Sequence, residues 1–266
     1  MKKINPLVSC VISTRGKAPT LDNCLRTIRN QNYKNVEIII IAENKLNETT
    51  ETAKKYNAKI FIGGVERSIK RNFGVSKARG NYVLIIDDDL ELDKNVIKEC
   101  IETIAEYDFL VIPELPFGSD FRAKCHRFEK MAYLDGFLPV EGARFFSRDL
   151  VQSVGGYDLI LVGAEDWDLT QRLLKLGYKV GRIKSRVNHN DGKYDFIKTL
   201  KKKYYYGRVY REYSKRYPTA FMKSVFRFQI LKNIKYILNH PILFIGSIAF
   251  RFVEGMAVLF GLIFNR

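Results

Sequence analysis

Three short, almost wholly apolar runs restrict the fold of this chain more than any other feature. They cover residues 7–12, 36–42 and 82–86, and β-branched residues are frequent in them. Runs of this kind are typical of strands that are buried on both faces. Between them, apolar residues recur at the three- and four-residue spacing of helices. The alternation predicts an α/β fold, with a parallel sheet that carries helices on both faces.

The other predicted elements follow from the same spacing of apolar residues. Up to residue 110 they are helices over 21–30, 49–56, 68–78 and 95–105 and a short strand over 59–62. Beyond residue 110 they are strands over 109–113, 142–147 and 179–183 and helices over 121–133, 148–154 and 166–176. The regular alternation of strand and helix therefore ends near residue 110.

Polar residues directly follow three of the predicted strands. Thr14 and Arg15 follow the first strand, Glu43 follows the second, and Asp87–Asp89 follow the strand over 82–86. Ligands of open parallel sheets bind beyond the carboxyl ends of the strands. We therefore expect these side chains to meet in one crevice.

The three adjacent carboxylates of Asp87–Asp89 repel one another unless something neutralises them. A hard divalent cation placed between these carboxylates and phosphate oxygens would do so. The plainer alternative is a solvated turn in which an aspartate caps the next helix.

A second acidic segment, Glu165-Asp166-Trp167-Asp168, stands at the start of a predicted helix. A carboxylate at this place is suited to act as a general base that deprotonates a hydroxyl. Asp166 and Asp168 also lie where helix caps belong. By itself, the segment leaves both interpretations open.

The four cysteines, Cys10, Cys24, Cys100 and Cys125, form no CxxC pair, and no histidine cluster accompanies them. This favours isolated reduced thiols in a core over a disulfide or a zinc site, and it suits a cytosolic compartment. The N-terminal apolar run is only a few residues long, so it indicates a first strand rather than a signal peptide.

Taken in order, these motifs resemble the family 2 glycosyltransferases, which have the GT-A fold, a Rossmann-like mixed sheet flanked by helices. The resemblance covers about residues 6–190. The matching stretches are VSCVISTRG from residue 8, LRTIRNQ from 25, RNFG from 71, YVLIIDDD from 82, GGYD from 155 and EDWDL from 165. An ordered set of this kind is more specific than any one motif. It implies a glycosyltransferase domain over 1–192, with a nucleotide-binding half of about 1–110 and an acceptor half of about 111–192.

The resemblance also implies a role for each matching residue. Asp166 would be the catalytic base of an inverting transfer, and Mg²⁺ or Mn²⁺ would bridge the donor diphosphate. The implied metal ligands are Asp87, Asp89 and, at a position where some relatives carry a histidine, His189. The implied donor-binding residues are Thr14, Arg15, Glu43, Arg71, Asp87 and Asp88. The acceptor side would include Arg144, Glu165 and Trp167.

Two positions depart from the family pattern. Ser13 stands where the family usually has proline before Thr14. The second strand ends in Ala42-Glu43, where the family usually has two aspartates and the first reads the uracil base. A UDP-sugar is therefore only a default donor. His189 has an equally plain interpretation as a polar loop residue.

The C-terminal region is strongly basic. Residues 193–266 hold 15 Lys and Arg against 3 Asp and Glu, which is 12 of the net charge of +16. This imbalance indicates a polyanionic partner, either anionic lipid head groups or nucleic acid. Residues 218–238 show the pattern of a basic amphipathic helix.

The apolar stretch Pro241–Phe264 is about long enough to cross a bilayer. Arg251 and Glu254 lie three residues apart in it and are placed to pair on one helix face. The stretch would either span the membrane or lie at its interface. A third alternative is a C-terminal helix that packs on the catalytic domain or on a second subunit. We predict a membrane-associated extension over 193–266 and a cytoplasmic catalytic domain.

The predicted function is transfer of a sugar from a nucleotide-sugar to a lipid-linked or cell-surface glycan acceptor. Two alternatives remain. A nucleotidyltransferase would share the nucleotide-binding core but would give no reason for the Glu165-Asp166 segment. A nucleic-acid-binding protein would use the basic, tyrosine-rich stretch 196–217, but it would not need the apolar segment 241–264. No nucleic-acid partner is therefore expected, and the oligomeric state is left open.

Overall fold

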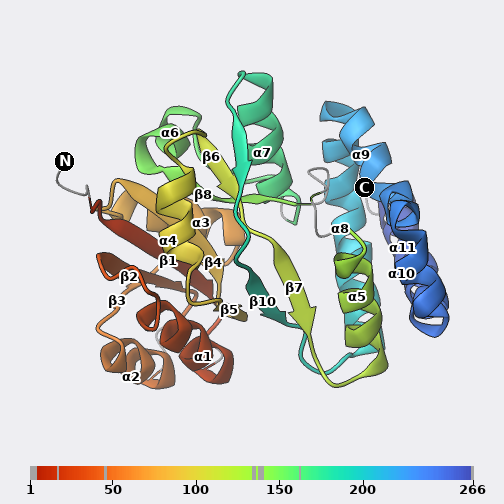
Figure 1. Ribbon diagram of the computed structural model, residues 1–266, viewed down its shortest axis with the longest axis horizontal. Coiled ribbons are helices and arrows are strands. Elements are labelled where there is room, and N and C mark those ends of the chain that lie inside the picture. The colour runs from red at the N-terminus through yellow and green to blue at the C-terminus, as the bar shows by residue number, and fades with distance from the viewer. Residues whose placement is uncertain are drawn as a thin grey trace.

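A seven-stranded mixed sheet organises the first two thirds of the chain (Figure 1). The structure, a computed structural model, describes residues 5–16, 18–44, 47–133, 136, 141–161 and 163–264. The strands lie in the order β3-β2-β1-β4-β8-β6-β9. Their bounds are β1 Val8–Thr14, β2 Val36–Ala42, β3 Lys59–Ile62, β4 Tyr82–Asp87, β6 Phe109–Val111, β8 Ala143–Ser147 and β9 Val180–Arg182. β8 runs antiparallel to both of its neighbours, β4 and β6, and the other pairs are parallel.

Helices cover both faces of this sheet, as the apolar spacing predicts. Successive residues of β1 point to opposite faces: Cys10 and Ile12 join one core, and Val11 joins the other. The first core is closed by α1 Ala18–Arg29, α2 Asn47–Lys55 and α4 Val96–Thr103. The second is closed by α3 Arg67–Lys77, α6 Arg148–Ser153 and α7 Glu165–Lys175. The four cysteines are buried and unpaired, as expected.

A second, three-stranded sheet has no counterpart among the predicted elements. It consists of β5 Leu90–Leu92, β10 Val187–Asn190 and β7 Glu114–Phe117, in that order. These strands are only three or four residues long, so any alternation of apolar and polar residues is too short to identify them in the sequence. Their partners lie far away in the sequence. β10 places His189 opposite Leu90, one residue beyond Asp89.

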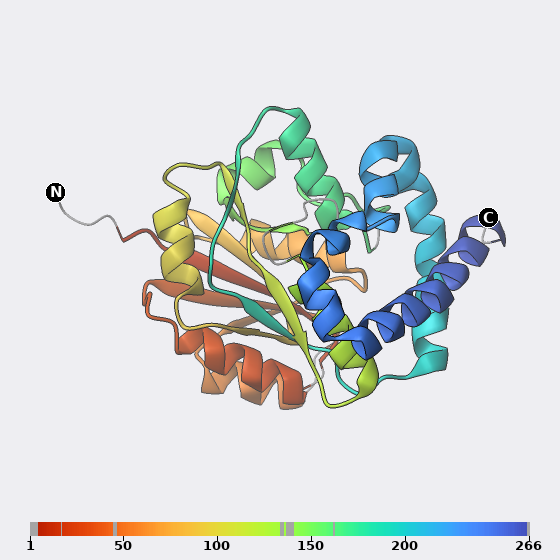
Figure 2. The ribbon, with the colours of Figure 1, turned by 45° about the vertical axis from the view of Figure 1, so that its right-hand side comes forward.

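The C-terminal region is helical and packs beside α5 Phe121–Met131 (Figures 1 and 2). It consists of α8 Phe196–Arg216, α9 Pro218–Val225, the 3₁₀ helix η2 Phe228–Asn233, α10 Ile234–Asn239 and α11 Pro241–Phe264. The prediction of one amphipathic helix over 218–238 is wrong, because three short helices occupy this stretch. Tertiary contacts with the end of α5 explain the breaks. Arg227 bonds to Glu129 and to the Tyr133 hydroxyl, and Asn233 Nδ2 donates to the carbonyl of Ala132 at 2.6 Å.

The expected pairing of Arg251 with Glu254 is also wrong. Arg251 donates to Glu129 on α5. Glu254 accepts from Arg122 on α5 at 2.9 Å and pairs with Lys203 on α8 at 3.0 Å. Both charges of α11 therefore tie this helix to the rest of the protein, because carboxylates and cations on the neighbouring helices offer closer partners than its own face.

Close backbone contact also joins α11 to α8. A Cβ atom at Gly207 of α8 would lie 2.3 Å from the carbonyl oxygen of Val258. A Cβ atom at Gly261 of α11 would lie 1.9 Å from the carbonyl oxygen of Tyr204. Only glycine permits the two helices to approach this closely.

Candidate active site

The carboxyl ends of β1, β2 and β4 bring the predicted donor residues together. In the sheet register, Ser13 lies opposite Asp87. The Thr14 hydroxyl donates a hydrogen bond to the Asp88 carboxylate, and it accepts one from the Gly16 N–H at 2.8 Å. The neighbouring positions are Glu43, which is half-buried, and Arg15, which is exposed. These strand ends form one edge, as the strand order requires.

A buried ion pair network connects this edge to α7. Arg71 is 1% exposed. Its Nη2 donates to Asp87 Oδ1 at 3.0 Å, and its Nη1 donates to Glu165 Oε1 at 3.0 Å. Burial by itself would raise the pKa of Asp87, but Arg71, Arg67 and Arg144 hold it well below its usual range. Arg71 thus fixes the end of β4 against the start of α7.

Asp166 is the carboxylate next to this network. Its Oδ1 accepts a hydrogen bond from the Trp167 N–H at 2.9 Å, and among the described residues no group donates to its Oδ2. Gly142 makes room for it, since a Cβ atom there would lie 2.5 Å from Asp166 Oδ2. Burial and the nearby Glu165 carboxylate raise the pKa of Asp166. Glu165, by contrast, is fully buried and bonded to Arg71 and to the Gly163 N–H.

Asp89 and His189 lie beside each other on the other side of Asp87. His189 Nε2 is 3.3 Å from Asp89 Oδ2, and His189 Nδ1 is 2.8 Å from Glu114 Oε1. Burial lowers the pKa of His189, but Glu114 and Asp89 outweigh it and raise that pKa well above its usual value. Asp89 Oδ1 is buried and has no hydrogen-bond partner among the described residues. Such an oxygen favours a ligand that the chain itself does not supply.

These groups suit a divalent cation only as a partial set of ligands. The described part of the chain gathers no three His, Cys, Asp or Glu side chains that would hold a metal by themselves. Mg²⁺ commonly takes one or two carboxylates and completes its shell with water and substrate phosphates. The Glu114–His189 contact is also the outer-shell contact that usually orients a metal-binding imidazole. Asp89 and His189 therefore fit the cation better than Asp87, whose two oxygens face Arg71.

The predicted acceptor-side residues Arg144 and Trp167 do not lie together in the structure. Arg144 is 12% exposed and donates to Glu114 Oε2 at 2.7 Å, while its Nη1 lies 3.7 Å from Asp87. The Trp167 ring stacks parallel to the ring of Tyr210 on α8, with 5.9 Å between centroids. Trp167 thus packs against the C-terminal region, and Arg144 links the two sheets beneath Asp87.

The sequence carries no motif for several residues that complete the site. Glu114 lies in the unpredicted strand β7. Arg67, at the start of α3, lies 3.6 Å from Glu165. Tyr206 on α8 packs on Gly163, where a Cβ atom would come within 2.8 Å of the tyrosine ring. The basic, tyrosine-rich composition around Tyr206 indicates an outer surface, so only the tertiary structure places α8 next to the site.

Known proteins with similar sequences are glycosyltransferases. The sequence model of glycosyl transferase family 2 matches residues 9–159. An uncharacterized glycosyltransferase of Methanocaldococcus jannaschii is 26% identical over 226 residues, which are 76% of this chain and 78% of that protein. The putative glycosyltransferase EpsH of Bacillus subtilis is 26% identical over 118 residues, but these are only 33% of its length.

Solved structures of the same fold carry nucleotide-sugars. The mannosyltransferase PcManGT from Pyrobaculum calidifontis, solved with GDP-Man and Mn²⁺, has a TM-score of 0.67 at 12% identity, over 99% of this chain and 88% of that one. A TarS fragment from S. aureus, solved with UDP-GlcNAc, has a TM-score of 0.58 at 15% identity, over 88% and 73% of the two chains. At these identities the similarity shows the GT-A fold alone.

Proposed function

Because the chain belongs to glycosyl transferase family 2, we propose that it is an inverting, metal-dependent enzyme that transfers a sugar to a lipid-linked or cell-surface glycan. The acceptor group would be a hydroxyl or a phosphate. The observation that carries this proposal is the Arg71 bridge, which holds Asp87 and Glu165 at 3.0 Å each. Through it, the acidic end of β4 and the carboxylate of Asp166 face one site.

Asp166 is proposed as the general base. An inverting transfer needs a group that takes the proton of the acceptor hydroxyl while its oxygen attacks the anomeric carbon of the sugar. Asp166 Oδ2 receives no hydrogen bond from the described residues, whereas Glu165 is bonded within the protein. The raised pKa of Asp166 is closer to the working pH than that of an ordinary aspartate. A carboxylate with a higher pKa accepts a proton more readily, as long as it is still ionised.

Asp89 and His189 are proposed as the ligands of Mg²⁺ or Mn²⁺. When bound, the cation would supply positive charge that stabilises the departing nucleoside diphosphate. Glu114 would orient the imidazole of His189, and Asp87 would hold Arg71 and Arg144 in place. Thr14, Arg15, Glu43 and Asp88 remain the proposed contacts to the nucleotide. The two similar solved structures contain GDP-Man and UDP-GlcNAc, which differ in their base. A UDP-sugar is therefore simply the first donor to test.

The C-terminal helix supports the proposal of a membrane-bound acceptor. In the described residues, α11 is the one helix long and apolar enough to cross a bilayer. One side of it is tied to α5 and α8 through Arg251 and Glu254. The other side exposes a row of apolar side chains: Ile242, Ile245, Ile248, Phe252, Met256, Leu259 and Ile263.

This arrangement favours a helix that lies in the membrane interface over one that spans the bilayer. Spanning would either break the ion pairs to Arg122, Glu129 and Lys203 or pull these charges into hydrocarbon, and both are costly. A helix with one apolar face and basic surroundings is suited to lie in the plane of the head groups. We therefore propose an interfacial protein whose catalytic domain faces the cytoplasm.

A screen of nucleotide-sugars for release of nucleoside diphosphate tests the proposed function. The unsubstituted protein should release it with Mn²⁺ or Mg²⁺ and not with EDTA, and Asp89→Ala should abolish this release. Asp149→Ala is a matched control, because Asp149 is 85% exposed and follows the end of β8 that pairs with Tyr82, at the opposite end of β4 from Asp87. Metal-independent release, or equal activity of the two variants, would refute the proposal. Transfer of a nucleotidyl group instead would identify a nucleotidyltransferase.

A further inference from the structure

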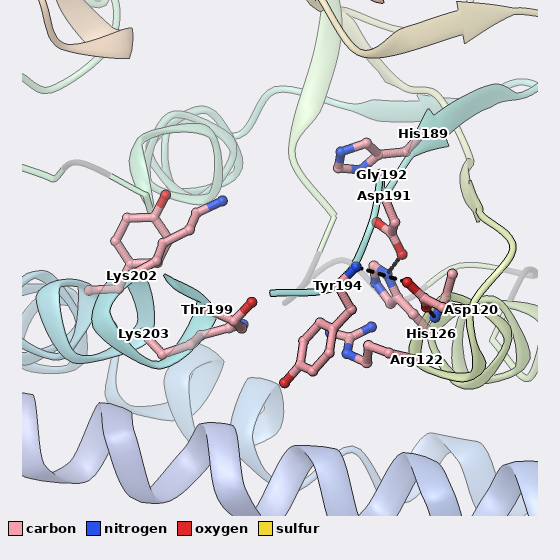
Figure 3. A pocket seen from close by; sticks show the side chains of 12 residues that line it. Asp120, Arg122, His126, His189, Asp191, Gly192, Tyr194, Thr199, Lys202 and Lys203 are labelled. Atoms are coloured by element: carbon pink, nitrogen blue, oxygen red, sulfur yellow. Dashed lines mark hydrogen bonds and ion pairs between the residues drawn. The ribbon is translucent and has the colours of Figure 1, made fainter. Parts of the chain in front are cut away.

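A polar pocket of about 230 Å³ lies beside His189, between α5, β10 and the first turns of α8 (Figure 3). It contains neither Asp166 nor the predicted nucleotide contacts, so it is a separate hollow next to the candidate metal site. The charged and histidine side chains of its lining are Asp120, Arg122, His126, His189, Asp191, Lys202 and Lys203. The Asp120 carboxylate accepts hydrogen bonds from the N–H groups of Ala123 and Tyr194.

Most charges in the lining already have a partner. Arg122 and Lys203 share Glu254 of α11, at 2.9 and 3.0 Å. Asp191 Oδ2 is 2.8 Å from His126 Nδ1. Lys202 differs, because no carboxylate of the described residues pairs with it. The pocket therefore offers one ammonium group whose charge is not neutralised by the protein.

The position of Lys202 connects the pocket to the reaction site. In Figure 3, Lys202 reaches from α8 on one side of the hollow, and His189 stands on the other side. Lys202 as a whole is exposed. Partial desolvation lowers its pKa, and so do the nearby Arg67 and Arg15, while Asp89 and Asp87 oppose this effect. The ammonium group thus lies within electrostatic reach of the acidic end of β4, but no carboxylate of the described residues pairs with it. Its Nζ lies over the Tyr206 ring, 5.6 Å from the ring centroid.

We propose that this pocket binds a phosphate group of the acceptor, with Lys202 as the cation that contacts it. A cation next to other donors in a polar hollow is a suitable site for a phosphate. The donor diphosphate is expected on the Thr14 and Asp88 side of Asp89, so the pocket lies beyond it. On its other side, Arg122 and Lys203 bond to Glu254 of α11, the helix proposed to lie in the membrane interface.

This inference rests on the proposed function and adds the part of the acceptor that is recognised. A lipid carrier with a phosphate head group would keep its chain in the bilayer beside α11. Its phosphate would enter the pocket, and the glycan attached to it would extend past Asp89 and His189 so that its acceptor hydroxyl reaches Asp166. Phosphate recognition would thereby exclude neutral glycolipids that approach the same surface.

Equilibrium binding of octyl phosphate and of octyl glucoside to the full chain, measured by calorimetry, tests the proposal. We expect octyl phosphate to bind and Lys202→Ala to weaken that binding at least about tenfold, the effect of losing one charge-assisted contact. Lys202→Arg should retain most of the affinity. Lys201→Ala is the matched control, since Lys201, like Lys202, is exposed on α8 but does not line the pocket, so its loss should leave the affinity unchanged.

Three results would overturn the proposal. Equal weakening by Lys202→Ala and Lys201→Ala would mean unspecific attraction to a basic surface. Equal affinity for octyl phosphate and octyl glucoside would mean that the alkyl chain alone is bound. If Lys202→Ala weakened the binding of nucleoside diphosphate but left the binding of octyl phosphate unchanged, Lys202 would be a contact of the donor instead. Failure of the proposed function has a different signature: the unsubstituted protein would bind octyl phosphate through Lys202 but release no nucleoside diphosphate from any nucleotide-sugar.

Discussion

At the scale of single residues, five neighbouring carboxyl groups differ in their bonding partners and in how readily they take up a proton, because their surroundings differ. Asp87 faces Arg71 and is kept ionised, and Glu165 is enclosed by donors. Burial raises the pKa of Asp88 to about 6, although the Thr14 hydroxyl counteracts this. Asp89 keeps one buried oxygen without a partner, and Asp166 has a raised pKa. Groups whose environments push their pKa values apart can divide structural, ligand-binding and proton-transfer roles among them.

Arg71→Ala should destabilise the protein by about 3–5 kcal/mol, because it removes the buried cation that Asp87 and the fully buried Glu165 share. Only the longer contacts of Arg67 to Glu165, at 3.6 Å, and of Arg144 to Asp87, at 3.7 Å, would remain. Urea unfolding measures this change. Lys54→Ala removes an exposed ion pair with Glu51 and should cost less than about 1 kcal/mol. Similar losses in the two variants would show that the Arg71 network contributes little to the fold.

Asp166→Asn should lower transfer by about 10²–10⁴-fold, because the amide cannot accept the proton of the acceptor. Binding of the donor and of Mn²⁺ should persist. If binding and transfer fall together, Asp166 has a structural role.

The activity of the unsubstituted protein should also fall as the pH is lowered. The base is active when ionised, and the pKa of Asp166 is raised, so this loss should begin at a higher pH than for an ordinary aspartate. The pH profile of kcat/KM reports the free enzyme. An acidic limb at or below the usual range of aspartate would contradict the assignment of Asp166 as the base.

At the scale of the elements, helix packing decides what surrounds the site. α8 lies beside α7 through the stacked rings of Trp167 and Tyr210, and Tyr206 packs on Gly163. α11 in turn holds α8 through the close contact at Gly207 and Gly261. The position of Lys202 and of the pocket therefore depends on a helix that contributes no side chain to either.

Gly261→Ala and Gly255→Ala make the same change at two positions of α11 and should have opposite effects. At Gly261 the new Cβ atom would lie 1.9 Å from a backbone oxygen of α8, so the helices must separate and the protein should lose stability. At Gly255 nothing lies within 4 Å. There, alanine should be neutral or stabilise the helix by up to about 1 kcal/mol. Thermal unfolding of both variants measures the difference, and equal midpoints would rule out tight packing of α8 against α11.

At the scale of the whole molecule, the mixed sheet lies on one side, and the basic C-terminal helices with α11 lie on the other (Figure 2). The candidate site is at the border between them, since Tyr206 of α8 packs on Gly163. Most of the net positive charge belongs to residues 193–266. Exposed apolar residues surrounded by cations match the surface of an anionic bilayer, and the pocket at Lys202 lies between that surface and Asp89.

Phe252→Glu should weaken binding to anionic vesicles at least about tenfold, because Phe252 is 69% exposed on the outer face of α11 and its burial in lipid is lost. Ile160→Glu is the control: Ile160 is 66% exposed but lies in the loop before α7. Co-sedimentation with vesicles measures the difference. Equal binding by both variants, or none by the unsubstituted protein, would exclude α11 as the membrane contact.

Local patterns in the sequence were sufficient for the four parallel strands β1–β4 and for the acidic end of β4, but they did not predict that β8 runs antiparallel to its neighbours. The runs at 36–42 and 59–62 predict β2 and β3 with their observed bounds, and the bounds of α11 follow from its apolar length. A strand buried on both faces must be apolar throughout, and a parallel sheet must gather its carboxyl ends at one edge. Thr14 and Asp88 are therefore brought together by rules that need no knowledge of distant contacts.

Only the tertiary structure decided which partner each charge has and where the short elements pair. Arg251 and Glu254 are three residues apart, yet each bonds to another helix, because α5 and α8 place Glu129, Arg122 and Lys203 closer. The β5-β10-β7 sheet, which brings His189 to Asp89 and Glu114, is made of strands too short to show a period. Ion pairs and short strands depend on groups that are distant in the sequence, and their energies are set by the dielectric surroundings that folding creates.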